Sequence, residues 1–207
     1  MADVIENPEK EREFALICEA QAGNAASFGA LYDLYAPRIY RFIFVKTGNR
    51  TDAEDLTHEV FLSGWRTIAG WQKRDSVPFS SWLYQIARNR VIDWYRTAKS
   101  NPSLDEMIAG NSLPTELVST GGAGLMQALH QKFELQTVMD AVRELTPDQQ
   151  DVIVMRFVED LTPEETGAAI GKTASGVRLI QHRAIQKLKK TLESEKTDVR
   201  RIPHRTA

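Results

Sequence analysis

The chain has 207 residues, of which 42% are hydrophobic and 26% are charged, a balance typical of a globular protein with a buried core. No apolar run approaches the roughly 20 residues that span a bilayer, and the acidic start of the chain lacks the basic and apolar segments of a signal peptide. The single cysteine, Cys18, excludes an internal disulfide and a multi-cysteine metal site. We therefore expect a cytoplasmic protein without membrane insertion.

The net charge of −2 hides an uneven distribution of charged residues. Four acids and no Lys or Arg stand between residues 52 and 59, whereas residues 172–190 hold six basic residues and no acid. A protein that contacts both DNA and another protein would show this pattern, and so would ordinary solvated helix faces.

Helical periodicity dominates the sequence, and no stretch shows the alternation of a strand. Apolar residues recur every three or four positions over Phe28–Phe42 and predict an amphipathic helix that bends near Pro37. Thr51 and Asp52 are predicted to cap the next helix. The apolar face of that helix is Leu56, Val60, Trp65 and Ile68.

A third helix is predicted to begin at Ser80 or Ser81 and to carry apolar residues from Leu83 to Trp94. Aromatic and basic residues interleave through this helix and the loop before it, a composition that suits unstacked single-stranded nucleic acid. Core packing would explain the same aromatics. The loop over 72–78 is the better candidate for holding a flipped base.

Residues 100–124 are rich in Pro, Gly, Ser and Thr and are predicted to form a linker. The fold prediction is therefore all-α, with two small helical domains joined by a flexible linker. We expect an N-terminal arm over 1–18, a first domain over 19–98, the linker over 99–130, a second domain over 131–193 and a C-terminal tail over 194–207.

Three adjacent segments after the linker predict a helix-turn-helix. A helix begins at Thr146–Asp148. Thr162 and Glu165 have the spacing of a capping box. Gly171 supplies the turn, and Thr173 is predicted to cap the last helix.

The last helix is predicted to enter the major groove of DNA, which is wide enough for one helix. Its first turns would present Ser175, Arg178 and Leu179 to base edges, with Gln181 or His182 as further candidates. Phosphate contacts would come from the basic residues further along, which are Arg183, Lys187, Lys189 and Lys190.

Four segments in this order resemble the extracytoplasmic-function sigma factors of the sigma-70 family. They read QAGNAASFGALYDLYAPRIYRF, DAEDLTHEVFLSGW, PFSSWLYQIARNRVIDWYR and LTPDQQDVIVMRFVEDLTPEETGAAIGKTASGVRLIQHRA. The resemblance covers about Glu19 to Leu192. It implies a transcription initiation factor whose first domain reads and melts the −10 promoter element and whose second domain reads the −35 element.

The resemblance also implies three sets of contact residues. Those that would dock on the β′ clamp helices of core RNA polymerase are Asp52, Glu54, Asp55, Glu59 and Phe61. Those that would hold the single-stranded −10 element are Lys73, Arg74, Phe79, Trp82, Arg88, Asn89 and Asp93. Those that would read duplex DNA at the −35 element are Thr173, Ser175, Arg178, Leu179, Gln181, His182, Arg183 and Lys187.

Further expectations concern the partners. The linker would thread through polymerase, the helix Asp148–Phe157 would lie near the β flap, and an anti-sigma factor would control the protein. One part of the recognition helix departs from the family pattern: Leu179, Ile180 and Gln181 stand where Ser or Thr, Arg or His, and Leu are common. The promoter sequence is therefore left open.

Two other classes compete with this interpretation. A helix-turn-helix repressor or activator would need a dimer or ligand domain, for which 52–96 offer neither a heptad nor an evident pocket. An enzyme would need a catalytic constellation, and the sequence predicts none: no catalytic residues, no metal site and no cofactor. The four histidines are scattered without metal-ligand spacing.

Overall fold

The structure is a computed structural model that describes residues 8–73, 77–99 and 136–199. Every element in these ranges is helical. Most of the predicted linker over 99–130 lies outside these ranges, and so does Arg74. The first domain consists of α1 (Pro8–Gln21), α2 (Ala25–Thr47), α3 (Arg50–Thr67), η1 (Ile68–Gly70) and α4 (Phe79–Lys99). The second consists of a helical segment over 136–143, α6 (Pro147–Ile153), η5 (Val154–Val158, a π-helical turn), α7 (Pro163–Ile170) and α8 (Ala174–Val199).

Helix α2 forms the centre of the first domain, and α1, α3 and α4 pack against it. Its apolar side chains are fully buried, as at Leu31, Ile39 and Phe42. The helix runs through Pro37 and ends at Gly48, whose φ of 67° is a left-handed conformation that glycine adopts without strain.

Two predicted helix starts in this domain are wrong. Asn49 caps α3 by accepting a hydrogen bond from the Asp52 N–H at 3.2 Å, in place of the predicted Thr51 or Asp52 cap. Helix α4 begins at Phe79, so that Ser80 and Ser81 lie inside it and are buried. In both places the chain offers several polar residues in succession, and packing selects which one begins the helix.

The predicted N-terminal arm is in large part a helix of the first domain. Ile17 and Ala20 of α1 are 2% exposed and belong to the core. The Glu13 carboxylate also accepts a hydrogen bond from the Tyr35 hydroxyl of α2. Residues 8–18 therefore belong to the domain that was predicted to begin at residue 19.

The predicted helix-turn-helix is confirmed, together with its caps. Thr162 N–H donates to Glu165 Oε2 at 2.7 Å, and Glu165 N–H donates to Thr162 Oγ1 at 3.2 Å, which completes the capping box. Gly171 makes the turn with a φ of 70°. Thr173 Oγ1 accepts from the Gly176 N–H at 3.2 Å at the start of α8. This helix extends to Val199, beyond the predicted start of the tail at residue 194.

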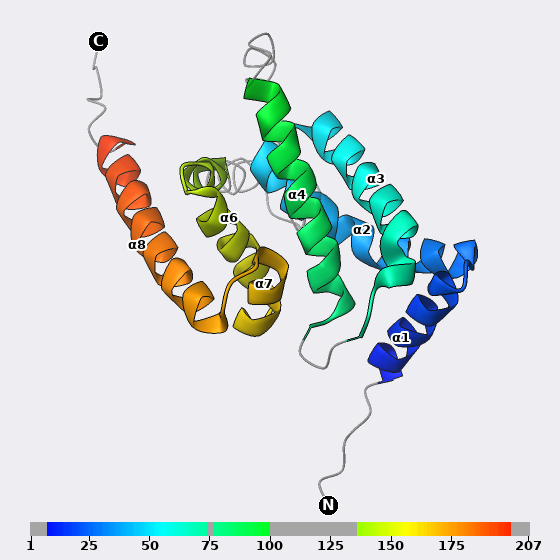
Figure 1. The fold of residues 1–207 in the computed structure, drawn as a ribbon. Helices are drawn as coiled ribbons and strands as arrows, with labels where there is room; N and C mark the ends of the chain where they lie inside the picture. The colour runs from blue at the N-terminus through cyan, green and yellow to red at the C-terminus, as the bar shows by residue number, and fades with distance from the viewer. Residues whose placement is uncertain (1–7, 74–76, 100–135, 200–207) are drawn as a thin grey trace, which may run out of the picture.

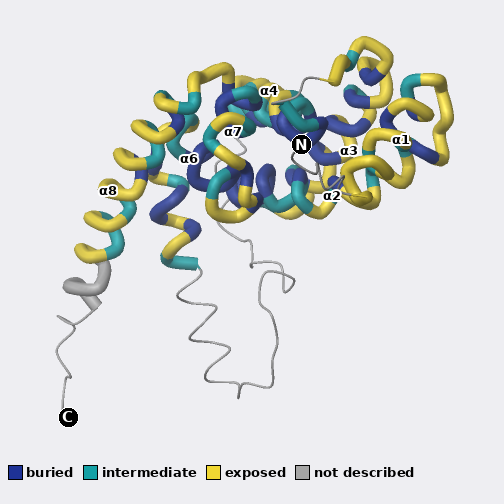
Figure 2. Tube along the Cα trace, turned by 90° about the horizontal axis from the view of Figure 1, so that it is seen from below, coloured by how far each residue is buried: buried dark blue, intermediate teal, exposed yellow. Residues whose placement is uncertain are grey.

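The two domains pack against each other through α4 and α7 and through η5 and α2 (Figure 1). Buried residues run without a break from α2 and α4 into α6 and α7, whereas the outer sides of α8 and α3 stay exposed (Figure 2). Within the ranges that the structure describes, no helix is long and apolar enough to cross a bilayer. The sequence predicted both domains but not the contact between them.

Helix α7 approaches the turn after it so closely that only glycine fits at position 167. A Cβ atom on Gly167 would lie 2.5 Å from the backbone oxygen of Lys172. We expect Gly167→Ala to lower the free energy of unfolding by about 1–3 kcal/mol, since backbone must shift to relieve the overlap. Urea unfolding followed by circular dichroism measures the change.

Gly29→Ala in α2 is the matched control, because a Cβ atom there meets nothing within 4 Å. That substitution should leave the stability unchanged or raise it by up to about 1 kcal/mol through helix propensity. Equal stabilisation by the two substitutions would contradict the close approach at Gly167.

Candidate polymerase-binding and DNA-binding surfaces

The acidic residues of α3 form one side of the first domain. Glu54, Asp55 and Glu59 are exposed, and Asp52 is half-buried. Burial raises the pKa of Asp52, and the nearby Asp55 raises it further, while a hydrogen bond from Trp94 lowers it. Three of the five predicted polymerase contacts are thus exposed, and one of these, Glu54, forms an ion pair with Arg50.

Phe61, the fifth predicted polymerase contact, is a packing residue in the structure. Its side chain is 4% exposed, and its ring lies against Phe28 and Tyr32 with ring centroids 6.4 Å and 4.7 Å apart. The exposed apolar residues of α3 are instead Leu62 at 56% and Trp65 at 36%. Trp65 was predicted to be part of the apolar core face. An apolar hollow of about 560 Å³ includes both residues.

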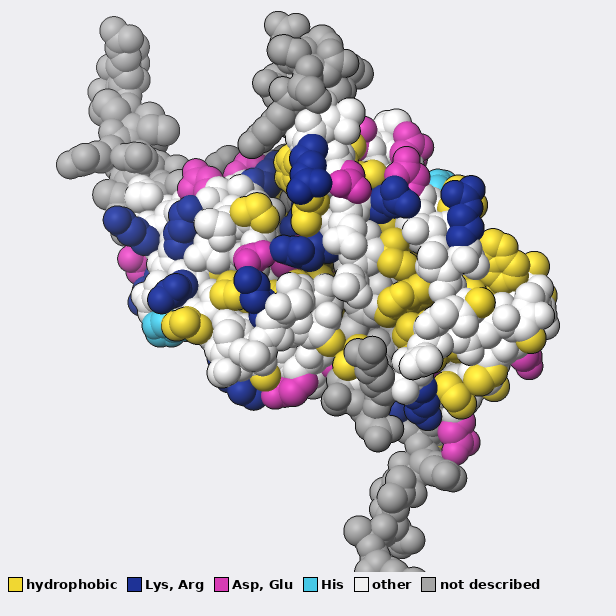
Figure 3. Space-filling view, in the orientation of Figure 1, with side chains coloured by type: hydrophobic (Ala, Val, Ile, Leu, Met, Phe, Trp, Pro, Cys, Tyr) yellow, Lys and Arg dark blue, Asp and Glu magenta, His cyan; other side chains and the backbone are white. Residues whose placement is uncertain are grey.

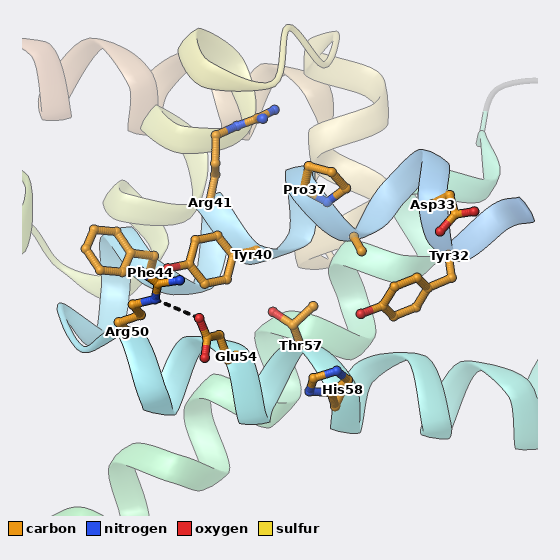
Figure 4. Close-up of a pocket in the computed structure, with 11 residues that line it drawn as sticks. Tyr32, Asp33, Pro37, Tyr40, Arg41, Phe44, Arg50, Glu54, Thr57 and His58 are labelled. Carbon is orange, nitrogen blue, oxygen red and sulfur yellow. Dashed lines mark hydrogen bonds and ion pairs between the residues drawn. The ribbon is translucent and has the colours of Figure 1, made fainter. Parts of the chain in front are cut away.

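A second hollow, of about 600 Å³, lies between α2 and α3 (Figure 4). Tyr40, Phe44 and the Arg50–Glu54 ion pair, at 2.8 Å, lie at one end of it and Tyr32 at the other, with Thr57 and His58 between them. The two hollows share Tyr32 and the exposed His58. The two hollows therefore form a groove with aromatic walls between α2 and α3, and Glu54 is the acid of α3 that lines it. The contribution of α2 to this surface was not predicted from the sequence.

The residues predicted to hold the −10 element follow α4 and the loop before it. Lys73, Asn89 and Asp93 are exposed, and Trp82 is half-buried. Lys73 Nζ lies 4.1 Å from the centroid of the Phe14 ring. Phe79 is 2% exposed and packs among aromatic rings, so the structure assigns it to the core.

Arg88, another predicted −10 contact, is engaged by the second domain. Its Nε donates to Asp151 Oδ2 at 2.8 Å and its Nη2 to Asp148 Oδ1 at 2.7 Å. Burial lowers the pKa of Arg88, but the hydrogen bonds and charges of the two aspartates outweigh this effect and raise it. Basic and acidic side chains accordingly meet where α4 faces the second domain (Figure 3).

Helix α8 presents most of the predicted −35 residues to solvent. Thr173, Ser175, Arg178, His182, Arg183 and Lys187 are exposed, as is Leu179 at 51%. Two of the basic side chains contact their own domain: Arg178 Nη2 lies 2.9 Å from Glu164 Oε1, and Lys187 donates to the Glu144 backbone oxygen. Gln181 is half-buried, and its Oε1 accepts a hydrogen bond from Arg156 at 3.2 Å.

Three basic residues of α2 contact the second domain and were not predicted from the sequence. Arg38 and Arg41 bind the Glu159 carboxylate, with Nε–Oε distances of 2.8 Å and 3.1 Å. Lys46 binds Asp151. A lysine inside the apolar run IFVKT was the available signal, because a buried lysine needs an acidic partner.

The fold and the surfaces define a helical DNA-binding protein whose helix-turn-helix is accompanied by a second, acid-faced helical domain. Comparison with protein families agrees with this class. Residues 31–101 match the family model described as Sigma-70 region 2, and residues 141–190 match Sigma-70, region 4.

Individual relatives carry the same assignment over most of their length. The sigma factor BldN of Streptomyces coelicolor is 34% identical over 89% of this chain and 67% of its own. SigD of Mycobacterium tuberculosis is 30% identical over 86% of this chain and 83% of its own. The solved structure of CnrH in complex with the cytosolic domain of CnrY shares the fold, with a TM-score of 0.66 at 20% identity over 88% of this chain and 98% of CnrH.

The chain belongs to the extracytoplasmic-function sigma factors of the sigma-70 family. As a sigma factor it binds core RNA polymerase and promoter DNA and directs transcription initiation. It is a transcription regulator and not an enzyme.

The burial of Phe61 can be separated experimentally from a contact role. Phe61→Ala should lower the free energy of unfolding by about 3–5 kcal/mol, since a large buried ring is removed. Leu62→Ala, one residue further along the same helix, should change it by no more than about 0.5 kcal/mol, because the side chain is largely exposed. Thermal unfolding by circular dichroism measures both, and a stable Phe61→Ala protein would refute the packing role.

Proposed function

We propose that α3 is the surface by which this sigma factor docks on the β′ clamp helices of core RNA polymerase, and that α8 is the helix that reads the −35 element. The observation that carries the proposal is the unequal distribution of exposed charge. Helix α3 exposes three acids, two arginines and the apolar Leu62 and Trp65, whereas α8 exposes five bases and no acid between residues 174 and 192. The two helices lie on opposite sides of the molecule (Figures 1 and 2). One helix can therefore bind a protein while the other binds DNA.

The groove between α2 and α3 supports the docking proposal. A protein interface needs an apolar centre that excludes water, and acids alone would supply only a polar rim. Leu62 and Trp65 supply that centre, and Glu54, Asp55 and Glu59 supply acids on the same helix. For the β flap, the exposed Phe157 and Val158 of η5 provide a second apolar contact, at the end of the segment Asp148–Phe157 that was predicted for this role.

The −10 element is proposed to lie along α4. Trp82 is accessible for stacking, and Asn89 can donate and accept hydrogen bonds with an unpaired base. Lys73 and Arg88 supply positive charge for the phosphates. This assignment needs Arg88 to exchange its aspartate partners for DNA.

Two regulatory expectations belong to the same proposal. CnrH was solved with the cytosolic domain of CnrY, and RpoE of Bartonella quintana, which is 18% identical with a TM-score of 0.62 over 80% of this chain and 96% of RpoE, was solved with the anti-sigma factor NepR. We propose that an anti-sigma factor likewise controls this protein by covering the exposed groove beside α3. We place its action in the bacterial cytoplasm, where core polymerase works.

Reversing one charge on α3 tests the docking surface. Asp55→Lys should lower the affinity for core RNA polymerase by about tenfold or more, because a cation would replace an acid in a surface that matches a basic partner. Glu11→Lys on α1 is the matched control, since it makes the same charge change at an exposed helical site. Fluorescence-detected binding of labelled core measures both variants, and equal affinities would remove the assignment of α3.

Removing one side chain from α8 tests base reading. Arg178→Ala should weaken binding of the holoenzyme to the cognate −35 element by about 1–3 kcal/mol relative to a scrambled element. Lys187→Ala should weaken binding to the cognate and to the scrambled element by similar amounts, because a phosphate contact does not depend on sequence. Run-off transcription and gel shifts with core polymerase measure the ratio of cognate to scrambled binding for each variant. If both variants keep the full preference for the cognate over the scrambled −35 element, α8 does not read the bases.

A further inference from the structure

An exposed ion pair joins the two helices of the helix-turn-helix on the outside of the second domain. Arg178 Nη2 of α8 lies 2.9 Å from Glu164 Oε1 of α7. The two side chains are 60% and 51% exposed. Exposed ion pairs contribute little to stability, because water screens them and two long side chains lose conformational freedom. The stability of the fold therefore does not account for this pair.

The backbone holds the two residues of the pair at a fixed separation. Gly171 makes the turn between α7 and α8, and the Lys172 N–H donates to the Gly167 backbone oxygen at 2.9 Å across that turn. Val177 is 0% exposed and fixes the first turns of α8 in the core. The remaining freedom of the pair therefore lies in the rotamers of its two side chains.

The two acids in the first turn of α7 have different partners. Glu165 accepts a hydrogen bond from the Thr162 N–H at 2.7 Å and so completes the capping box. Glu164 instead accepts from Arg178, which lies 14 positions further along the chain. Since the capping box uses Glu165, the start of α7 does not depend on Glu164.

The contact with Glu164 leaves most of the Arg178 guanidinium available to another partner. A guanidinium carries five N–H donors in one plane, and the ion pair is formed through Nη2. Arginine reads guanine in the major groove by donating two hydrogen bonds, to O6 and N7. Arg178 can therefore donate to guanine while Glu164 still holds it.

Holding the guanidinium in place beforehand favours base reading. A free arginine side chain has many rotamers, and fixing one of them on a base costs conformational entropy. A charge-assisted hydrogen bond from a neighbouring helix reduces that cost, because the side chain is already oriented before DNA arrives.

We propose that Glu164 is a positioning residue for base reading, which holds the Arg178 guanidinium in the orientation that donates to a guanine of the −35 element. The inference rests on the proposed role of α8 as the helix that reads this element. It adds a residue of α7, the first helix of the helix-turn-helix, to the determinants of promoter specificity. Glu164 acts through Arg178 and does not itself contact a base.

The test measures the preference for each base at each position of the −35 element. The probe is a promoter of this sigma factor, found by run-off transcription, whose −35 element is randomised. Holoenzyme made from the full chain and core RNA polymerase is bound to this mixture of duplexes, and the bound DNA is sequenced. Since all sequences compete in one mixture, a uniform change in affinity caused by a lost negative charge cancels.

The wild-type protein should prefer guanine at the position that faces Arg178. Arg178→Ala should abolish this preference, because the side chain that reads the base is gone. Glu164→Gln should lower the same preference about three- to tenfold, since a neutral amide holds a guanidinium less firmly than a carboxylate does. Preferences at the other positions should stay within about twofold of the wild type.

Asp160→Asn is the matched control, because it removes one carboxylate from an exposed site of the same domain. Asparagine tolerates the positive φ of 53° at this position. The control should change no base preference, and both variants should melt within about 3 °C of the wild type, since neither substitution removes a buried group. A Glu164→Gln protein that kept its full preference for guanine would overturn the positioning role. An equal loss of preference at every position would overturn it as well, because that pattern indicates damage to the domain.

Combining Glu164→Gln with Arg178→Ala separates an action through Arg178 from a direct contact with DNA. The double variant should have the preferences of Arg178→Ala alone, because no guanidinium remains to be positioned. A further loss of preference in the double variant would refute the positioning role and assign Glu164 a base contact of its own. If Arg178→Ala itself keeps every preference, the base-reading role of Arg178 fails and takes this inference with it. Loss in Arg178→Ala without loss in Glu164→Gln overturns the inference alone.

Discussion

The carboxylate of Asp151 joins the two domains of this sigma factor. It accepts hydrogen bonds from Lys46 and from Arg88, so that one side chain of α6 binds two helices of the first domain. Burial lowers the pKa of Lys46, and the charge of Asp151 opposes that effect. Removing one partner from such a cluster would leave an uncompensated buried charge, which costs several kcal/mol. The position of the helix-turn-helix relative to α4 therefore depends on this group of charges remaining complete.

In this arrangement the proposed binding surfaces differ in how far they are exposed. The acids of α3 and the bases of α8 are exposed, whereas Arg88 is occupied by Asp148 and Asp151. Polymerase could thus dock on α3 before the domains separate, and α4 would become available for the −10 element afterwards. An order of this kind follows from the proposed roles, because only the surface that must hold melted DNA is covered. It would keep a free sigma factor from holding single-stranded nucleic acid before it meets polymerase.

The features that sequence predicts well here are those set by neighbouring residues. The capping box of Thr162 and Glu165 and the turn at Gly171 need no information from elsewhere in the chain, and both are present. The helix starts at Phe79 and after Asn49 differ from prediction because several local choices were nearly equal and packing selected among them. Phe61 and Trp65 lie on the same edge of the buried face of α3, and Phe61 is the nearer of the two to its centre. Phe28 and Tyr32 of α2 therefore cover Phe61, while Trp65 stays 36% exposed. The interdomain ion pairs join residues about 60 to 120 positions apart, and periodicity carries no signal at that range.

The specificity of α8 depends on the side chains that are free to reach base edges. Gln181 is partly removed from that role, since its side-chain oxygen accepts a hydrogen bond from Arg156 and the residue is half-buried. The neighbouring Ile180 is also half-buried, whereas Leu179 is exposed. An exposed leucine in the major groove can contact a thymine methyl group but cannot read hydrogen-bonding groups. In the proposed contact of α8 with the −35 element, Leu179 is therefore the one of these three residues that is placed to alter the preference, towards an element with a thymine at the facing position.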